Sequence, residues 1–253
     1  MSKEKAKVSA YVLAYNEEAK IEDCIKSVLW ADEVILIDSH STDNTAKIAQ
    51  DLGAKVVQVN FEGFGKIRMA GIEFTSHDWI LSIDADERCT EAAKTEIIDI
   101  INMQTTNDAY FIPRRNTFMG KKIRFCGWYP NYRQPQLFKR GKMTYEVKDL
   151  VHEDYKVAGT VGYLKKDIIQ IPFLSISEVI YKMDRYSNLG AQELKNKKQT
   201  NNLILILIRS FWTFTRIYIF KLGILDGKYG FIISYFNMIG TFCKYLKAKD
   251  PFR

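Results

Sequence analysis

The fold is decided by residues 33–53, which read EVILIDSHSTDNTAKIAQDLG. The apolar run Val34-Ile35-Leu36-Ile37 is typical of a strand buried on both faces of a sheet. A polar loop follows at residues 39–43, and residues 45–52 have helical spacing that ends at Gly53, a residue that often terminates helices. The stretch therefore predicts a strand, a loop and a helix, which is the repeating unit of a parallel α/β sheet.

The same unit recurs on both sides of this stretch. Upstream, residues 8–14 are a short apolar run, the polar cluster Tyr15-Asn16-Glu17-Glu18 follows, and residues 19–30 have helical spacing. Downstream, the same reasoning predicts strands at residues 56–59 and 78–83 and helices at residues 66–74 and 90–101. This alternation predicts an α/β fold with a mostly parallel sheet and helices on both faces.

The pattern changes beyond residue 101. Tyr110-Phe111-Ile112 and the turn-rich residues 116–140 predict antiparallel strands and loops. Long helices are predicted at residues 177–195, 203–221 and 229–247. We therefore expect one domain over residues 1–175, made of two halves at 1–100 and 101–175, and a helical extension over 176–253.

Positive charge is concentrated near the C-terminus. The whole chain carries +7, and residues 195–253, with eleven Lys or Arg and two Asp, carry +9, which leaves −2 for residues 1–194. Because these cations alternate with long apolar runs, they favour an anionic membrane surface over nucleic acid. Residues 203–220 are apolar enough to span a bilayer, but Arg209 and Arg216 would each cost about 2.5–3.5 kcal/mol at its centre. We expect an interfacial helix, with a spanning helix and a soluble helical cap as alternatives.

Composition excludes several classes of protein. The chain is 47% hydrophobic and 26% charged, near the averages of globular proteins, which argues against a disordered chain or a multi-span membrane protein. The four cysteines are far apart and form no CxxC pair, which argues against a zinc ribbon or a disulfide framework. Residues 1–7 are lysine-rich with no apolar stretch behind them, so no secretory signal is visible and we expect a cytosolic chain.

Polar side chains follow three of the predicted strands. Ligands of parallel α/β sheets bind at the carboxyl ends of the strands, and these ends meet at one edge. We therefore expect three pairs of residues to converge there: Asn16 and Glu18, Asp38 and Ser39, and Asp84 and Asp86.

Asp84-Ala85-Asp86 is the sharpest of these signals. Two carboxylates two residues apart at a strand end can serve a nucleotide and a divalent cation together. Mg²⁺ or Mn²⁺ prefers one or two carboxylates plus substrate phosphates, and we expect Asp86 to be the metal ligand. The metal would offset the charge that develops on a departing diphosphate. The alternative is an acidic turn that caps the helix starting near Thr90.

The other clusters also have two interpretations. The Asp38 carboxylate can accept hydrogen bonds from a base or ribose, or residues 39–43 can be a turn with Thr42 or Asp43 as the helix cap. We expect Asp38 to be functional and Asp43 and Asn44 to be structural. Residues 15–18 suit either a platform for a pyrimidine base or another N-cap. The last signal is the pair of cations Lys66 and Arg68. They either bind a diphosphate or line a solvated helix face.

Three ordered motifs carry a resemblance to a known family. They are VSAYVLAYNEE at residues 8–18, IDSHSTDNT at 37–45 and IDADE at 83–87, and with them the chain resembles family 2 glycosyltransferases of the GT-A, Rossmann-like fold. Later stretches are similar to the branch that adds β-linked glucose to the lipopolysaccharide inner core: Gly127-Trp128-Tyr129-Pro130, Val151-His152-Glu153 and LGILDGKYGF at 222–231.

The resemblance implies an inverting, metal-dependent transfer of a hexose, glucose by the likeness, from a UDP-sugar to a lipopolysaccharide-core or other lipid-linked saccharide. Residues 1–175 would then be the catalytic domain, with a nucleotide-sugar half at 1–100 and an acceptor half at 101–175. The enzyme would work in the cytoplasm, peripherally attached to the inner face of the cytoplasmic membrane. Glu153 matches the position of the family's base, and Asp154 is the alternative base. Mn²⁺ or Mg²⁺ would bind Asp86. His152 would either join the metal or orient the diphosphate. The nucleotide-sugar would contact the following residues, with Asp84 at the ribose: Ala14, Tyr15, Asn16, Glu18, Asp38, Ser39, Lys66, Arg68, Asp84 and Ala85.

Two positions depart from the family pattern. Met69 stands where members often carry Asn after the arginine, and Gln136 stands where an arginine is expected before Leu137-Phe138. A nucleotide-sugar-binding scaffold without turnover is therefore the alternative function. A nucleotidyltransferase or a Rossmann-type oxidoreductase is a weaker alternative, because no GxGxxG follows the first strand.

Overall fold

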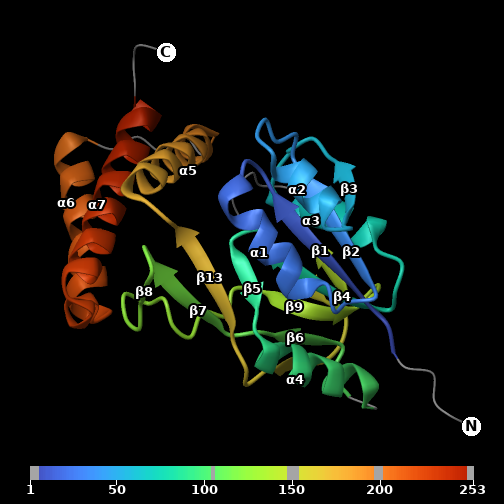
Figure 1. The fold of residues 1–253 in the computed structure, drawn as a ribbon. Helices are drawn as coiled ribbons and strands as arrows, with labels where there is room; N and C mark the ends of the chain where they lie inside the picture. Colours follow the sequence, from blue (N-terminus) through green and yellow to red (C-terminus); the bar gives the residue numbers. More distant parts are fainter. Residues whose placement is uncertain (1–5, 104–105, 147–153, 197–201, 250–253) are drawn as a thin grey trace, which may run out of the picture. The chain divides into compact units, whose positions relative to one another are not determined.

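The computed structural model describes residues 6–103, 106–146, 154–196 and 202–249. The chain divides into two compact units, and Figure 1 shows their elements coloured along the sequence. The first unit comprises residues 1–114 and 132–170, and the second comprises residues 115–131 and 171–253. Residues 115–131 therefore belong with the C-terminal helices.

The first unit is built on a seven-stranded sheet in the order β12-β6-β9-β4-β1-β2-β3. The β1–β2, β1–β4, β2–β3 and β6–β12 pairs are parallel, and β9 runs antiparallel to both β4 and β6. The predicted α/β class with a mostly parallel sheet is thus confirmed. The strand bounds are β1 Val8–Ala14, β2 Glu33–Asp38, β3 Lys55–Gln58, β4 Trp79–Asp84, β6 Ala109–Phe111, β9 Pro135–Lys139 and β12 Val161–Tyr163.

Helices cover both faces of this sheet because its strands are apolar on both sides. In β1, the side chains of Ala10 and Val12 enter one core with α1, α2 and α4, whereas Tyr11 enters a second core with α3 and the β10–β11 hairpin. The four helices lie within two residues of their predicted ranges: α1 Glu18–Val28, α2 Thr45–Asp51, α3 Phe64–Phe74 and α4 Glu91–Asn102.

Shorter strands complete the first unit. β10 Met143–Tyr145 and β11 Tyr155–Val157 form an antiparallel hairpin. β5 Glu87–Cys89 pairs antiparallel with residues 168–170 of β13 Ile168–Phe173, so the chain segment after the Asp84-Ala85-Asp86 loop is fixed at once by a strand.

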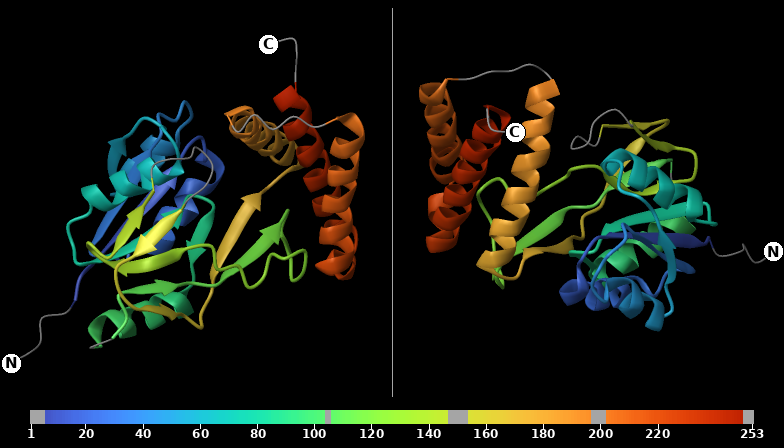
Figure 2. Two further views of the ribbon diagram at one scale, coloured as in Figure 1. Left: turned by 180° about the vertical axis from the view of Figure 1, so that it is seen from behind. Right: turned by 90° about the horizontal axis from the view of Figure 1, so that it is seen from above.

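The second unit contains three long helices, which lie side by side in both views of Figure 2: α5 Ile176–Asn196, α6 Leu203–Thr215 and α7 Lys228–Lys249. All three were predicted, but the α-helical part of α6 ends at Thr215, and the next turn, Arg216–Phe220, is a π-helix. A short 3₁₀ turn, Gly223–Asp226, then leads into α7. The unit also contains β7 Arg114–Phe118 from residue 115 onward and β8 Lys121–Lys122.

The LGILDGKYGF motif joins the helices to residues 115–131. The Asp226 carboxylate accepts hydrogen bonds from the backbone N–H groups of Arg124 and Phe125, at 3.2 and 2.9 Å. A Cβ atom at Gly230 would lie 1.8 Å from the carbonyl oxygen of Gly223, so only glycine permits this close approach of α7 to the turn before it. The motif thus has a structural role in the second unit.

The α6 segment keeps most of its apolar side chains outside the core. Residues Leu203–Phe220 form the one candidate for a membrane span among the described residues, and only 17% of this window is buried. Ile204, Ile208 and Phe211 lie on one face of the helix and are 69%, 59% and 67% exposed. A solvent-exposed apolar face of this kind indicates an interaction site.

Candidate active site

Strand order reverses at one place in the sheet. From β1 the chain continues to β2 and β3 on one side, and β4 lies on the opposite side of β1. Open α/β sheets bind ligands outside the carboxyl ends of their strands at such a point. In register, Asp38 of β2 lies beside Ala14 of β1, and Asp84 of β4 lies beside Leu13, so the ends of the three strands that carry the predicted pairs meet at one edge.

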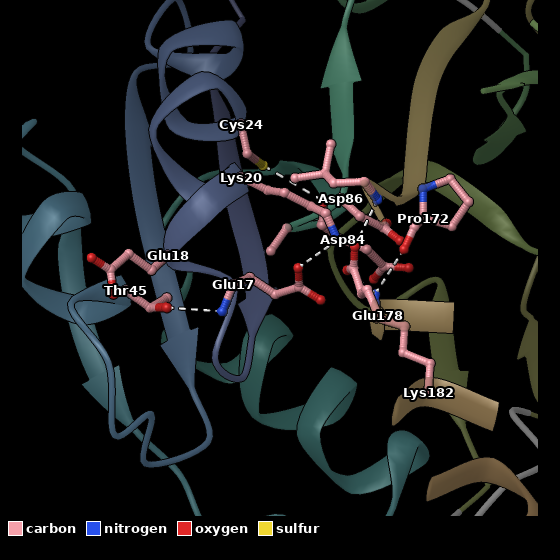
Figure 3. Close-up of polar contacts among 12 residues, drawn as sticks. Glu17, Glu18, Lys20, Cys24, Thr45, Asp84, Asp86, Pro172, Glu178 and Lys182 are labelled. Carbon is pink, nitrogen blue, oxygen red and sulfur yellow. Dashed lines mark hydrogen bonds and ion pairs between the residues drawn. The ribbon is translucent and has the colours of Figure 1, made fainter. Parts of the chain in front are cut away.

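The loops after β1 and β2 brace each other through side chains. The Asn16 side-chain oxygen accepts a hydrogen bond from the Thr42 N–H at 2.8 Å, and the Glu18 carboxylate accepts from the Asn44 N–H and side-chain amide. The Glu17 N–H donates to the Thr45 hydroxyl at 2.9 Å (Figure 3). Asn16 and Glu18 are both exposed, and Asn16 has a left-handed backbone with φ 53°. The two clusters thus form one polar surface.

The structural roles expected for Asp43 and Asn44 are confirmed. Asp43 accepts hydrogen bonds from the N–H and hydroxyl of Thr45, and Asn44 donates to the Glu18 carboxylate. The capping role itself is wrong for Thr42 and Asp43, because the N-cap of α2 is Asn44. Neither α1 nor α2 has a side-chain cap at its N-cap residue, Glu17 or Asn44.

Asp38 is fully buried at the end of β2. Its carboxylate accepts hydrogen bonds from the N–H and hydroxyl of Ser41, so part of its accepting capacity holds its own loop. Ser39 and Ala14 are also buried, and the Ser39 N–H donates to the Ala14 carbonyl oxygen at 3.0 Å, which extends the β1–β2 ladder. Nucleotide contacts of these three residues stay predictions.

Arg68 and Asp84 form a forked ion pair. Arg68 is 3% exposed, and one of its guanidinium nitrogens lies 3.0 and 3.3 Å from the two Asp84 oxygens. Its other terminal nitrogen donates to the Ser82 hydroxyl at 3.1 Å. Burial by itself would raise the pKa of Asp84, but Arg68, Arg114 and Arg133 outweigh burial and lower it. Asp84 is therefore a carboxylate held ionised, next to a buried cation, at the end of β4.

Asp86 is partly exposed beyond this pair. One of its oxygens accepts a hydrogen bond from the Gln170 side-chain amide at 3.3 Å. The alternative role, capping of α4, is wrong for both aspartates, because the Thr90 side chain itself caps α4 by accepting from the Ala93 N–H at 3.1 Å. Within the described ranges, no group of three or more His, Cys, Asp or Glu residues is arranged to hold a metal.

Arg88 holds the loop between the two aspartates. Its guanidinium donates to the carbonyl oxygens of Ala85 and Glu87, at 3.0 and 2.8 Å, and to that of Lys20 in α1, at 2.6 Å. The buried Ala85 also donates its N–H to the Leu13 carbonyl oxygen of β1 at 3.0 Å. The Cys24 thiol lies 3.5 Å from the Asp84 carbonyl oxygen (Figure 3). The loop is therefore fixed to both β1 and α1.

A buried polar network lies under this loop. Glu87 is 0% exposed and forms an ion pair with Arg114, which is 1% exposed. The second Glu87 oxygen accepts from the Gln136 amide at 2.9 Å and from the Asp84 N–H at 3.0 Å. Burial raises the pKa of Glu87 to about 6, although Arg114 acts in the opposite direction. We did not predict a role for Glu87 or Arg114, and the network links them directly to Asp84.

The two departures from the family pattern have structural roles. Gln136 is buried and donates to the Ser82 carbonyl oxygen and to Glu87, the partner of Arg114, so a neutral amide stands where the resemblance leads us to expect an arginine. Met69 packs in the core of the α3 face, and its sulfur accepts from the Tyr145 N–H at 3.3 Å. Lys66 is 48% exposed and pairs with Glu62, as its solvated-face interpretation predicts.

The predicted base, Glu153, and its neighbour His152 lie outside the described residues. Asp154 is exposed, and its carbonyl oxygen accepts a hydrogen bond from the Glu146 N–H at 2.7 Å. The neighbouring Tyr145 ring lies 5.9 Å from the Arg68 guanidinium carbon, so the hairpin reaches the Arg68–Asp84 pair.

Comparison with known proteins identifies relatives for nearly the whole chain. Residues 9–148 match the model of glycosyl transferase family 2. The chain is 29% identical to the lipopolysaccharide core biosynthesis glycosyltransferase LpsC of Rhizobium meliloti, over 96% of this chain and 91% of LpsC. It is 28% identical to an uncharacterized glycosyltransferase of Rickettsia bellii, over 95% of this chain and 84% of the relative.

Among solved structures, the chain is similar to glucosyl-3-phosphoglycerate synthase from Mycobacterium tuberculosis, which was crystallised with Mn²⁺, UDP and glucosyl-3-phosphoglycerate. The two chains are 26% identical, the match covers 46% of this chain and 45% of the synthase, and the TM-score is 0.37. A TM-score this low describes a partial likeness only.

Proposed function

The chain belongs to glycosyltransferase family 2, and from this membership we propose that it transfers a hexose, glucose in the first instance, from a UDP-sugar to a lipid-linked saccharide of the lipopolysaccharide-core type. Sugar transfer follows from the family. The donor, the acceptor, the inversion of the anomeric centre and the dependence on a divalent metal are our proposals.

One observation carries the donor proposal. The Asp84-Ala85-Asp86 loop and the Tyr15-Asn16 loop lie where the strand order reverses, and both loops are held by hydrogen bonds within the protein. A nucleotide needs donors and acceptors already held in position, because ordering them on binding would weaken affinity. In this proposal the exposed Asn16 and Glu18 contact the base, and Asp84 accepts from the ribose.

The residues at this edge of the sheet suit a hard divalent cation that takes some of its ligands from the protein and the rest from the substrate. Asp86 offers a partly exposed carboxylate, while the Asp84 carboxylate is paired with Arg68. Mg²⁺ and Mn²⁺ in nucleotide sites take one or two carboxylates and complete their shell with phosphate and water. Asp86, with His152, would hold the cation, which supplies positive charge against the leaving diphosphate.

The chemical step in this proposal uses a carboxylate from the β10–β11 hairpin. Glu153, or Asp154 in its place, takes the proton of the acceptor hydroxyl. The hydroxyl oxygen then bonds to the anomeric carbon from the face opposite the nucleotide, while the bond from that carbon to the diphosphate oxygen breaks. Arg68, beside Asp84 and Tyr145, provides a fixed cation near the departing group.

We further propose that the second unit attaches the enzyme to the inner face of the cytoplasmic membrane. The exposed apolar face of α6 and the +9 charge of residues 195–253 support this proposal. An apolar helix face flanked by cations is suited to the interface of an anionic leaflet.

A scaffold that binds nucleotide-sugar without turnover is the second candidate. The observation in its favour is Gln136, whose amide donates to Glu87 at a position where the resemblance leads us to expect an arginine. Such a protein would bind UDP normally but would neither hydrolyse nor transfer the sugar.

The first experiment is calorimetric titration of UDP, with and without Mn²⁺, into the wild type and Asp86→Ala. We expect metal-dependent binding that is lost in Asp86→Ala, while Asp51→Ala, an exposed carboxylate change in α2, binds as the wild type does. Turnover of UDP-glucose then separates the transferase from the scaffold. Absence of UDP binding under all conditions would overturn the proposed donor.

A further inference from the structure

The second unit contains a cavity of about 300 Å³ that the proposed transfer reaction does not use. Its floor is aromatic, with Phe118, Trp128 and Phe173 in edge-to-face contact at centroid distances of 6.1 and 5.7 Å from Phe118. Val179 of α5 and Ile233 of α7 complete the apolar wall, and both are buried. The volume lies within the range of small-molecule sites.

Polar and cationic groups gather at the α5 and α7 side of this cavity. Lys182 lines the cavity but already pairs with Glu178 at 3.5 Å and donates to the Pro172 carbonyl oxygen at 3.2 Å (Figure 3). Lys244 also lines it, and of the carboxylates that the structure describes, none forms an ion pair with Lys244. Its ammonium lies 4.9 Å from the Tyr245 ring centroid.

Gly190 of α5 leaves space for the Lys244 side chain. A Cβ atom at Gly190 of α5 would lie 2.7 Å from Lys244 Cδ, so the lysine stem passes over α5 at a position without a side chain. The described C-terminal half of α7 carries three lysines, Lys244, Lys247 and Lys249, and no acidic residue. Lys247 pairs with Asp184 at 2.6 Å, so the attraction of an anion to this end of the cavity rests mainly on Lys244, the one of the three that lines it.

We propose that this cavity binds one acyl chain of an anionic membrane lipid, with the lipid headgroup at Lys244. An aromatic floor with a cation at its edge is complementary to an apolar chain that ends in a negative charge. The choice of a lipid over a soluble anion rests on α7, which lines the cavity and also packs against α6, whose exposed apolar face belongs to the proposed membrane attachment. The inference deepens that proposal by giving the attachment a specific lipid site.

The experiment titrates dodecyl phosphate, kept below its critical micelle concentration, into the full chain by calorimetry. We expect saturable binding of one dodecyl phosphate per chain, binding of dodecyl maltoside at least tenfold weaker, and no heat from inorganic phosphate. Lys244→Glu should weaken dodecyl phosphate binding at least tenfold. Lys249→Glu makes the same charge change on the same helix outside the cavity and should change affinity less than twofold.

A cavity-filling pair tests the acyl chain. Asn237→Trp adds bulk at a lining residue of α7 and should abolish binding, whereas Tyr235→Trp, on the same helix but outside the lining, should retain it. Circular dichroism and thermal melting check folding, and Met183→Phe replaces Asn237→Trp if that variant does not fold. Equal losses in Lys244→Glu and Lys249→Glu, retained binding in the filled variant, or competition by inorganic phosphate would each overturn the acyl-chain site.

The two proposals fail in different ways. The cavity variants should bind UDP as the wild type does. If the wild type does not bind UDP, that result counts against the donor proposal and has no bearing on the lipid site. Vesicles of neutral and anionic phospholipid then test the source of the lipid. We expect Lys244→Glu to prefer anionic vesicles less than Lys249→Glu does, although both variants lose the same charge, and equal preference of the two variants would overturn the site.

Discussion

Glu87 and Arg114 form an ion pair from which water is excluded, with side chains 0% and 1% exposed. The pair lies directly beneath the loop that carries Asp84 and Asp86, because the same Glu87 carboxylate accepts from the Asp84 N–H. A buried pair of this kind stabilises the fold only while both partners are present. The position of the loop therefore depends on a charge balance inside the core.

Removal of one partner should be severe. We expect Arg114→Met to lower the free energy of unfolding by about 3–5 kcal/mol, because the Glu87 carboxylate stays buried without its cation. Urea denaturation followed by circular dichroism measures the change. Lys26→Met, which removes an exposed partner of Glu22, is the control and should change stability little. Recovery of stability in the double variant Glu87→Gln, Arg114→Met is also expected, and equal losses in the single and double variants would contradict the account.

The two cations of α3 should differ in their effect on nucleotide binding. Arg68→Lys loses the forked contact with both Asp84 oxygens, and we expect UDP to bind about tenfold more weakly, which is about 1.4 kcal/mol. Lys66→Met changes an exposed lysine two residues earlier and should leave the affinity near that of the wild type. The same calorimetric titration measures both. A larger loss in Lys66→Met would show that the exposed cation, and not the buried one, meets the diphosphate.

The cysteines should react unequally with thiol reagents. Burial raises the pKa of Cys89 and Cys126 to about 12 and raises that of Cys24 further, so their thiolate fractions at pH 8 are very small. Cys243 is only half-buried. We expect one thiol per chain to react quickly with a disulfide reagent at pH 8, four in urea, and none quickly in Cys243→Ser. Rapid reaction of more than one thiol in the folded protein would contradict the burial of the other three.

The apolar face of α6 should determine membrane attachment. We expect the wild type to float with anionic vesicles at low salt and less at high salt, because the cationic residues are screened. The double variant Ile204→Glu, Ile208→Glu should float several-fold less. Leu29→Glu, at an exposed apolar residue of the first unit, is the control. Unchanged flotation of the double variant would show that another part of the chain attaches the protein to the membrane.

The sequence was sufficient for the secondary structure of the sheet region but not for the contacts beneath its site. The apolar runs and helical spacing predict β1, β2 and α1–α4 closely. Those elements bury one face or both, and burial produces a regular spacing of apolar residues in the sequence. Glu87 and Arg114 leave no such signal. They are 27 residues apart, and a charged residue inside a short strand is read as exposed unless its partner is known.

The second unit shows a similar limit. Three helices are visible in the sequence, but the attachment of residues 115–131 to them depends on contacts such as those of Asp226 with residues about one hundred positions earlier. The LGILDGKYGF motif could be matched to a family, yet its physical reason, the approach of Gly230 to Gly223, is visible only in three dimensions.

The π-helix at residues 216–220 continues α6 without a break, because Thr215 and Arg216 keep helical backbone angles. The 18 residues of Leu203–Phe220 would rise about 27 Å, close to the hydrocarbon core of a bilayer at about 30 Å, so length does not decide how this segment meets a membrane. Charge does: Arg209 and Arg216 lie within the segment, and each would cost about 2.5–3.5 kcal/mol at the bilayer centre. The two arginines therefore favour a helix that lies parallel to the bilayer plane, which would keep both of its ends, and the chain attached to each, on the same side of the membrane.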